Sequence, residues 1–228
     1  MLIAIIPARG GSKRISKKNI KKFAGTPAIS RAIKAAKKTK LFDRIIVSTD
    51  DHKIASISKK YNAEIPFIRP SKLADDKTIV SKVVAHAIKW LHSKNQYPKA
   101  VCCIFPTAVF VKDKDIIKAY KIFKTGKWNF VFSATTFAHT FERSFYKKKN
   151  NGVKMLFPKR YKKRTQDFKK MYYDAGQFYW GKTEAWLKNK PIFDKSSTII
   201  NIPAWRAHDI DTLGDWKRAE IYSKYIKQ

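Results

Sequence analysis

The chain has 228 residues and a formal net charge of +33, with 50 lysines and arginines against 17 acidic residues. Its length fits one domain of ordinary size, and a hydrophobic content of 44% predicts a globular protein instead of a disordered one. The sequence contains no apolar run near the roughly 18 residues of a membrane span, and residues 2–6 are too short for a signal-peptide core. We therefore expect no membrane segment.

So positive a charge ordinarily suggests a nucleic-acid partner. However, 40 of the 50 cations are lysines spread along the chain, and only ten are arginines. Arginine dominates specific phosphate and base recognition because of its planar fork. A solvated lysine surface and long-range steering of anionic substrates are the alternatives to nucleic-acid binding. We expect no specific nucleic-acid partner.

Apolar runs that alternate with helical patterns predict an α/β fold. We expect strands at residues 2–6, 44–49, 64–68, 99–105, 129–135, 176–181 and 197–202. We expect helices at about residues 27–39, 52–61, 78–94, 114–125 and 212–227. Pro27 suits the first position of its helix, and Asp50 or Asp51 can cap the next one. Strands that alternate with helices imply βαβ units and a mostly parallel sheet.

The loop after the first strand carries the densest group of candidate site residues. The strand stops at Pro7, which cannot donate to a sheet ladder. Four cationic side chains, Arg9, Lys13, Arg14 and Lys18, follow it, and Lys17 makes a fifth. Ligands bind at the carboxyl ends of strands in such sheets, and Gly10 and Gly11 let a phosphate approach the backbone. The loop matches neither common glycine-rich phosphate motif, so a nucleoside triphosphate in another loop architecture and a plain solvated loop are the two interpretations.

The two cysteines, Cys102 and Cys103, are adjacent within the apolar run at residues 100–105. Neighbours on a strand point to opposite faces, so neither a bridge between them nor a shared metal site is expected. We predict buried, reduced thiols in a cytoplasmic protein. The five histidines show no metal-binding spacing with them.

Residues 137–173 interrupt the alternation with basic and aromatic residues. Asn150, Asn151 and Gly152 form a hairpin-turn signal inside this stretch. Its aromatic content is hard to leave on the surface of a monomer. Because the sequence contains no repeat and no separable linker, we expect a single domain at residues 1–228, with residues 137–173 as an interface excursion within it.

Asp209 and Asp211 form a pair of acids near the end of the chain. At i, i+2 spacing in an extended segment both side chains face the same way, and carboxylate oxygens suit a divalent metal. Alternatively, Asp211 or Thr212 caps the last helix, with Asp215 completing a box-like pattern. The spacing alone leaves both interpretations open.

Several of these segments together resemble the acylneuraminate cytidylyltransferases, which make CMP-activated nonulosonic acids. The matching stretches run in order along nearly the whole chain: Ile6–Ile15 with Lys18 and Asn19, Val47–Asp51, Phe67–Asp76, Asp174–Gly181 and Asp209–Trp216. The stretch at 174–181 resembles the branch that acts on pseudaminic acid. The resemblance implies a nucleotide-diphospho-sugar-transferase-like fold. It also implies that the sugar's anomeric hydroxyl attacks the α-phosphorus of CTP and releases pyrophosphate.

The resemblance assigns roles around the nucleotide. CTP binding is implied for Arg9, Gly11, Ser12, Lys13, Asn19, Arg69, Asp76 and Thr78. Catalytic roles are implied for Arg9 and Lys18, which would oppose charge as pyrophosphate leaves, and for the pair Asp209 and Asp211, which would hold Mg²⁺ or Mn²⁺. Arg69 would recognise cytosine, although a surface arginine is the alternative. Thr78 could instead cap the following helix.

Sugar binding is implied for a second set of residues: Arg164, Gln166, Asp167, Gln177 and Tyr179. Arginine is the natural bidentate partner of the sugar carboxylate. Phe178, in the same stretch, is equally a core residue. Phe105 stands where many neuraminate-activating relatives have glutamine, which disfavours neuraminate, and Val109 departs from the proline common in the pseudaminate branch.

The resemblance further implies a homodimer in which the excursion packs against the partner subunit. Legionaminic acid, N-acetylneuraminic acid and the shorter 3-deoxy-octulosonate are competing sugar substrates. A function from another class is a basic protein that binds RNA or another anion on the same fold. Paired acids beside a phosphate loop favour the enzyme, because a binding module has no need of them.

Overall fold

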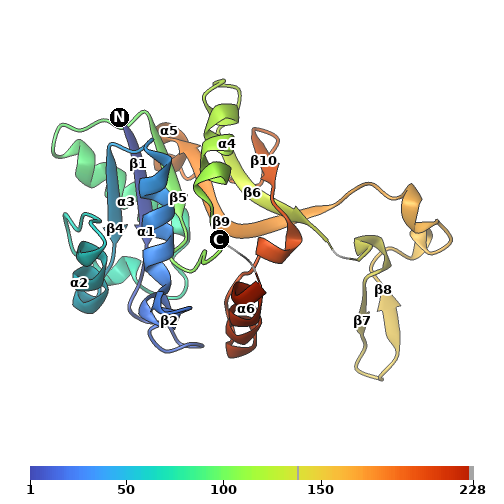
Figure 1. Ribbon diagram of the computed structural model, residues 1–228. Coiled ribbons are helices and arrows are strands. Elements are labelled where there is room, and N and C mark those ends of the chain that lie inside the picture. The colour runs from blue at the N-terminus through green and yellow to red at the C-terminus, as the bar shows by residue number, and fades with distance from the viewer. Residues whose placement is uncertain (138, 226–228) are drawn as a thin grey trace.

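A six-stranded sheet forms the centre of the computed structural model, which describes residues 1–137 and 139–225 (Figure 1). Its strands are β1 (Leu2–Pro7), β4 (Arg44–Ser48), β5 (Ala100–Ile104), β6 (Phe130–Thr136), β9 (Tyr172–Lys182) and β10 (Ser197–Asn201). They lie in the order β10-β6-β9-β5-β1-β4, and β9 runs antiparallel to both of its neighbours. The other pairs in this sheet are parallel, which confirms the predicted α/β class.

Helices cover both faces of the sheet. One face carries α1 (Ala28–Thr39), α2 (His52–Lys60) and α4 (Asp113–Phe123), and the other carries α3 (Val80–His92) and α5 (Thr183–Leu187). Alternation along β1 explains both layers, because Ala4 and Ile6 belong to the first core cluster and Ile3 and Ile5 to the second. The apolar run at residues 2–6 is therefore buried on both sides, as parallel strands usually are.

The order of the strands creates a crevice at the carboxyl end of β1. This strand lies between β4 and β5, and α1 and α3 lie on opposite faces. The connections therefore diverge at β1, and ligands of open α/β sheets bind at such a switch point.

A third apolar cluster ties the end of the chain to this crevice. A short hairpin of β2 (Lys22–Phe23) and β3 (Thr26–Pro27) carries Phe23, whose ring lies 5.7 Å from those of Phe110 and Trp216 in edge-on contacts. Trp216 belongs to α6 (Leu213–Tyr225). The segment just before α6 is thereby held beside the loop after β1.

Three sequence expectations differ from the structure. Residues 64–68 form no strand in the described chain and make two isolated bridges to β4 and its end, because Pro66 interrupts the ladder. Pro27 precedes the first residue of α1, and as part of β3 it pairs with Lys22 of β2. Thr78 does not cap α3, whose N-cap position is Ile79. The final positions of the last predicted helix, from 226 on, lie outside the described residues.

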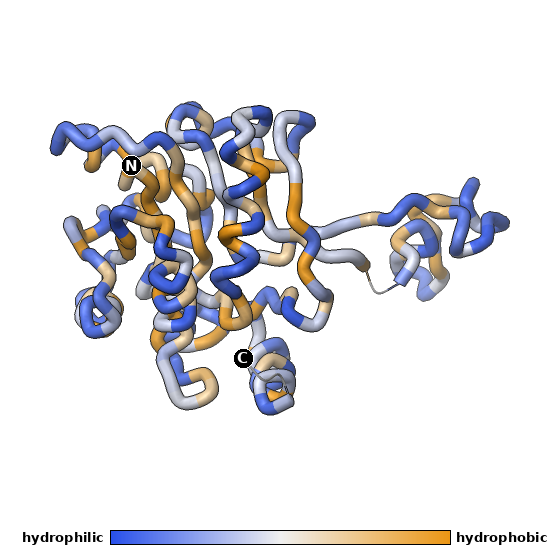
Figure 2. The backbone as a smooth tube through the Cα atoms, turned by 45° about the horizontal axis from the view of Figure 1, so that its top comes forward, coloured by the Kyte–Doolittle hydropathy of each residue, from blue (hydrophilic) through white to orange (hydrophobic). Residues whose placement is uncertain are grey.

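Residue 137 and residues 139–171, which we call the arm, extend away from the body in both views (Figures 1 and 2). Its hairpin consists of β7 (Phe145–Lys147) and β8 (Val153–Met155), joined through Asn151 in a left-handed conformation with φ of 65°. The predicted hairpin turn is therefore confirmed. Short 3₁₀ turns lie at Lys18–Ile20, Ser71–Leu73, Phe141–Arg143, Pro158–Arg160, Thr165–Asp167 and Ala204–Arg206.

Cys102 and Cys103 are both free and fully buried, and they belong to the two opposite core clusters, as predicted. Burial raises the pKa of both thiols, which keeps them protonated. Among the helices of the described ranges, none has the length and apolar content to cross a membrane.

Candidate active site

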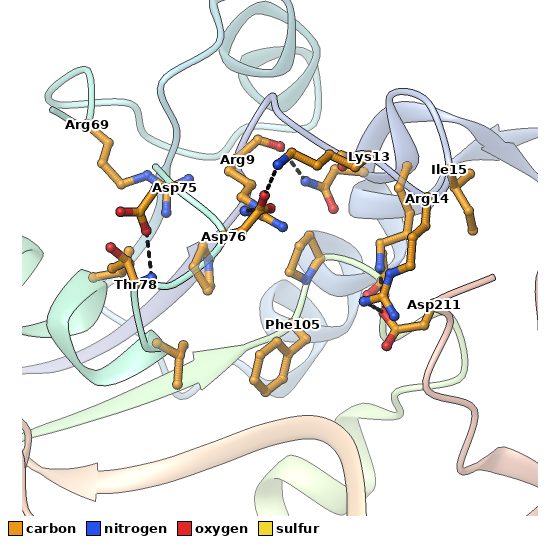
Figure 3. Close-up of a pocket in the computed structure, with 18 of the residues that line it drawn as sticks. Arg9, Lys13, Arg14, Ile15, Arg69, Asp75, Asp76, Thr78, Phe105 and Asp211 are labelled. Atoms are coloured by element: carbon orange, nitrogen blue, oxygen red, sulfur yellow. Dashed lines mark hydrogen bonds and ion pairs between the residues drawn. The ribbon is translucent and has the colours of Figure 1, made fainter. Parts of the chain in front are cut away.

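A cavity of about 280 Å³ opens at the carboxyl ends of β1 and β5 (Figure 3). Its walls come from the loop after β1, from residues 69–83, from residues 105–107 after β5, and from the segment before α6. It brings together most of the predicted nucleotide and catalytic residues: Arg9, Ser12, Lys13, Lys18, Asn19, Arg69, Asp76, Thr78 and Asp211. Two predicted residues, Gly11 in the same loop and Asp209 in the segment before α6, lie outside this lining. We call the cavity the crevice.

The loop after β1 is held in place by hydrogen bonds between its backbone and the side chains of Asp50 and Asn19. The Gly10 amide donates to Asp50 Oδ1 at 3.0 Å, and a Cβ at Gly10 would lie 2.9 Å from the Cβ of Asp51. Glycine is therefore required by the close approach of the β4–α2 connection. Asn19 donates through Nδ2 to the carbonyl of Arg9 at 2.8 Å, so this amide nitrogen already fixes the loop.

Two cations of the loop, Arg9 and Lys13, converge on one acid. Arg9 Nη1 and Lys13 Nζ each lie 2.5 Å from an oxygen of Asp76 (Figure 3). These hydrogen bonds, first that from Lys13 and then that from Arg9, lower the pKa of the Asp76 carboxyl. Asp76 comes from the connection before α3, so the two walls of the crevice meet through this contact.

The other two cations of the loop, Arg14 and Lys18, converge on a different acid. Arg14 Nη2 lies 2.9 Å and Lys18 Nζ 3.3 Å from Asp211 Oδ1. Lys18 also donates to the carbonyl of Ile210 at 2.6 Å, and its side chain is 20% exposed. Lys18 is therefore half-buried and not fully solvated. Its side chain connects the loop to the segment before α6.

Arg69 is buried, with 4% of its surface exposed, so the interpretation as a surface arginine is wrong. Its backbone amide donates to the Thr49 carbonyl at 2.7 Å, and Nη2 lies 3.5 Å from Asp50 Oδ1. Burial lowers the pKa of the guanidinium, and Nε has no hydrogen-bond partner within the described chain. A buried donor that faces the crevice suits recognition of a nucleobase carbonyl.

Asp50 is a site residue that sequence reasoning considered only as a helix cap. A single oxygen, Oδ1, contacts both the Gly10 amide and the Arg69 guanidinium. The cap of α2 is instead Asp51, which accepts from the Ile54 amide at 2.8 Å. The available signal was the position of Asp50 at the carboxyl end of a strand next to β1.

A bulge in β9 lies beside Asp209. The register against β6 slips, so that Phe132 pairs with Tyr179 and Ala134 pairs with Asp174. Gly176 lies in the bulge with φ of +61°, and its amide donates to Asp174 Oδ1 at 3.0 Å. A Cβ on Gly176 would lie 3.8 Å from Cγ of Asp209, so the bulge borders the acid pair. Bulges of this kind often lie next to active sites.

The β9 side chains predicted to bind sugar, Gln177 and Tyr179, donate hydrogen bonds to other groups of the protein. Tyr179 donates its hydroxyl to the Asp174 carboxylate, and burial raises the pKa of both groups. Gln177 is buried and donates Nε2 to the Arg206 carbonyl at 2.7 Å. Phe178 is fully buried in the core. Neither Gln177 nor Tyr179 lines the crevice.

The other predicted sugar residues lie on the arm. Arg164 and Asp167 form an exposed ion pair with an N–O distance of 3.2 Å. Gln166 lines a separate hollow on the arm, together with residues such as Phe141 and Lys170. Within one chain, the structure therefore does not bring these three residues to the crevice.

The acids before α6 have the chemistry of a magnesium site. The pKa of Asp209 is raised first by desolvation, although the side chain still reaches solvent, and then by the carboxylates of Asp211 and Asp174. In the described ranges, no three His, Cys, Asp or Glu side chains surround one point in a metal-binding arrangement. Mg²⁺ typically uses one or two protein carboxylates and completes its shell with water and substrate phosphates. The pair fits that donor set.

Thr212 and Asp215 cap α6, and Asp211 contributes only its backbone amide, which donates to Asp215 Oδ2 at 3.2 Å. Asp215 Oδ2 accepts from the Thr212 amide at 2.8 Å, and the Asp215 amide donates to Thr212 Oγ1 at 3.2 Å. This reciprocal pattern is a capping box. The predicted cap is therefore confirmed at Thr212, and Asp211 directs its carboxylate to the cations of the crevice.

A cation-lined crevice at the switch point of an α/β sheet, with Asp211 in its wall and Asp209 close to Asp211, is typical of a nucleotidyltransferase. A family model described as Cytidylyltransferase matches residues 3–223, and the chain belongs to this family.

The chain is 44% identical over 223 residues to a pseudaminic acid cytidylyltransferase of Campylobacter jejuni, covering 97% of this chain and 96% of the relative. It is 29% identical to a CMP-N,N'-diacetyllegionaminic acid synthase of Legionella pneumophila, over 96% of this chain and 94% of the relative. A solved CMP:2-keto-3-deoxy-manno-octonic acid synthetase complexed with CTP superposes with a TM-score of 0.70 over 99% of both chains. At 10% identity, that likeness concerns the fold alone.

Proposed function

We propose that this cytidylyltransferase transfers CMP from CTP to the anomeric hydroxyl of a nonulosonic acid, releasing pyrophosphate, and that this sugar is pseudaminic acid. The observation that carries the nucleotide part is the convergence of four loop cations and a buried arginine on one crevice. The sugar part rests on the much higher identity to the pseudaminate-activating relative than to the legionaminate-activating one. We further propose that the enzyme works in the cytoplasm, where its buried thiols stay reduced.

The chain's own residues supply orientation and charge. Arg9, Lys13 and Lys18 oppose the negative charge of the triphosphate, most of all as it develops on departing pyrophosphate. Arg69 donates to the cytosine carbonyl from its buried position, and Asp50 holds both that guanidinium and the loop. Such a transfer depends mainly on alignment of the hydroxyl with the α-phosphorus, which a rigid crevice favours.

We also propose that Asp209 and Asp211 hold Mg²⁺ or Mn²⁺. When bound, the ion neutralises phosphate charge and polarises the phosphoryl oxygens. The support is the chemistry of the donors, since both are carboxylates, Asp211 lines the crevice, Asp209 lies close to it, and a third acid, Asp174, adds negative potential beside Asp209.

The proposed reaction predicts a ranking of substrates. Pyrophosphate release from CTP should be fastest with pseudaminic acid and at least about tenfold slower with legionaminic, N-acetylneuraminic or 3-deoxy-octulosonic acid, because their substituents differ at the sugar pocket. A panel assay with each sugar measures this ranking. Faster turnover with another sugar would identify that sugar, and not pseudaminic acid, as the substrate. No turnover with any sugar, together with tight RNA binding, would favour the interpretation as a basic binding protein.

We propose that the arm packs against a second copy of the chain. Its support is the set of large side chains that the arm exposes: Phe145, Tyr146, Val153, Leu156, Tyr161 and Met171. So much exposed apolar surface is unusual for a monomer, and closed dimers are the commonest oligomers. In such a dimer, Arg164, Gln166 and Asp167 can contribute to the partner's crevice, which they do not reach in their own chain.

Light scattering at about 0.15 M salt should therefore give the mass of a dimer, because this ionic strength screens the repulsion between two cationic chains. Phe145→Ser with Tyr161→Ser should shift the mass toward the monomer and lower activity. Leu213→Ser, an exposed apolar residue on α6, is the matched control and should leave the dimer intact. A fully active wild-type monomer at tens of micromolar would contradict the proposal.

A further inference from the structure

Asp76 stands in direct contact with the cations that the proposed function assigns to the triphosphate. Its two oxygens each take one cation at 2.5 Å, Oδ1 from Arg9 and Oδ2 from Lys13. The contact is partly open to solvent, since the side chains of Arg9 and Asp76 are 34% and 39% exposed and that of Lys13 is 80% exposed. A carboxylate in this position repels any phosphate that approaches the same two cations.

The turn that carries Asp76 is stabilised independently of it. The neighbouring Asp75 accepts backbone hydrogen bonds from Lys77 at 3.0 Å and from Thr78 at 2.6 Å through Oδ1 (Figure 3). These bonds form a local Asx turn that does not involve the Asp76 side chain. Asp76 can therefore release its two cations by rotation of its own side chain, without unfolding of the connection before α3.

We propose that Asp76, for which the resemblance implies a role in CTP binding, is instead an internal competitor of the nucleotide triphosphate, which must displace this carboxylate from Arg9 and Lys13 in order to bind. The proposal rests on the proposed function, because that function assigns these cations to the phosphates. Competition of this kind sets a charge threshold. A triphosphate or pyrophosphate carries several negative charges and displaces one carboxylate readily. A monophosphate carries fewer charges, so it gains less binding free energy from the same cations and does not displace the carboxylate as readily.

The inference distinguishes the two acids of the crevice. Asp211 also contacts two cations, Arg14 and Lys18, but it belongs to the proposed metal pair, so in titrations that contain Mg²⁺ its removal should weaken nucleotide binding. Asp76 lies on the opposite wall, and its neutralisation should strengthen binding. Opposite signs for two acids in one cavity are not expected if both only support the fold.

Calorimetric titration with CTP, inorganic pyrophosphate and CMP tests this, without any sugar present. Asp76→Asn should bind CTP and pyrophosphate about three- to tenfold more tightly, the range that two exposed ion pairs can contribute. CMP affinity should change by less than about twofold, since a monophosphate gains little from the freed cations. The gain for pyrophosphate should shrink as salt is raised, because exposed charge pairs are screened.

Glu184→Gln is the matched control. It removes the same charge from an exposed ion pair, which Glu184 of α5 forms with Lys188 just after that helix. Its affinities should equal those of the wild type, and an equal gain there would assign the effect to net charge and overturn the proposal. Unchanged or weaker pyrophosphate binding in Asp76→Asn, in a variant with wild-type melting temperature, would also overturn it. If the wild type itself binds neither CTP nor pyrophosphate, the proposed function fails first.

Discussion

Lys18→Ala is expected to lower the turnover of CTP about 10²- to 10³-fold, equivalent to about 2.7–4 kcal/mol of transition-state stabilisation. The reason is that Lys18 would oppose the charge on departing pyrophosphate from a half-buried position, where solvent screens less. Lys18 also contacts the Ile210 carbonyl and Asp211, so its loss loosens the segment that carries the acid pair. Arg9→Ala should have a smaller effect of the same kind, because its contact with Asp76 is more exposed.

Steady-state pyrophosphate release separates these contributions. We expect a fall in kcat for Lys18→Ala that exceeds any rise in KM for CTP, because the contact strengthens as charge develops. Lys22→Ala is the control, since Lys22 is an exposed lysine of the β2–β3 hairpin outside the crevice lining. Wild-type rates in both crevice variants, with folded protein, would remove this loop from the triphosphate site.

Local sequence patterns were sufficient to predict most of the sheet and the gathering of the loop cations at the carboxyl end of β1. Apolar runs bounded by Pro7 or by charged residues identify strands that are buried on both faces, and the periodicity of residues 28–39 and 80–92 identifies amphipathic helices. The cations after β1 could be assigned to one site because the carboxyl end of a central strand is where open sheets bind ligands. Each of these inferences depends on residues close together in the chain.

The features that were missed depend on contacts between distant segments. Asp50 joins the Gly10 loop and Arg69 across two connections, and no local pattern distinguishes such an acid from a helix cap. The bulge around Gly176 arises from the register of β9 against β6, whereas the residue alternation alone predicted a regular strand. The short hairpin at residues 22–27 was also missed, because it is stabilised by the Phe23 contacts with Phe110 and Trp216.

The acid pair provides the second large expected effect. Asp209→Asn should abolish turnover at micromolar Mg²⁺ and recover part of it at tens of millimolar, because an amide is a poorer ligand for a hard cation than a carboxylate. Asp211→Asn should be more severe, since it also removes the partner of Arg14 and Lys18. Asp209 has no ion pair of its own in the described chain, so its variant isolates the metal requirement more cleanly.

Metal titrations of turnover, with a chelator as the zero point, provide the measurement. Asp215→Asn is the matched control from the same segment. It weakens the capping box of α6 and should reduce stability by about 0.5–2 kcal/mol while leaving the Mg²⁺ dependence unchanged. Metal dependence in the wild type that shifts in Asp209→Asn but not in Asp215→Asn would assign the ion to the pair. Full wild-type turnover in excess chelator would mean that these acids act without a metal, by holding Arg14 and Lys18 in the crevice.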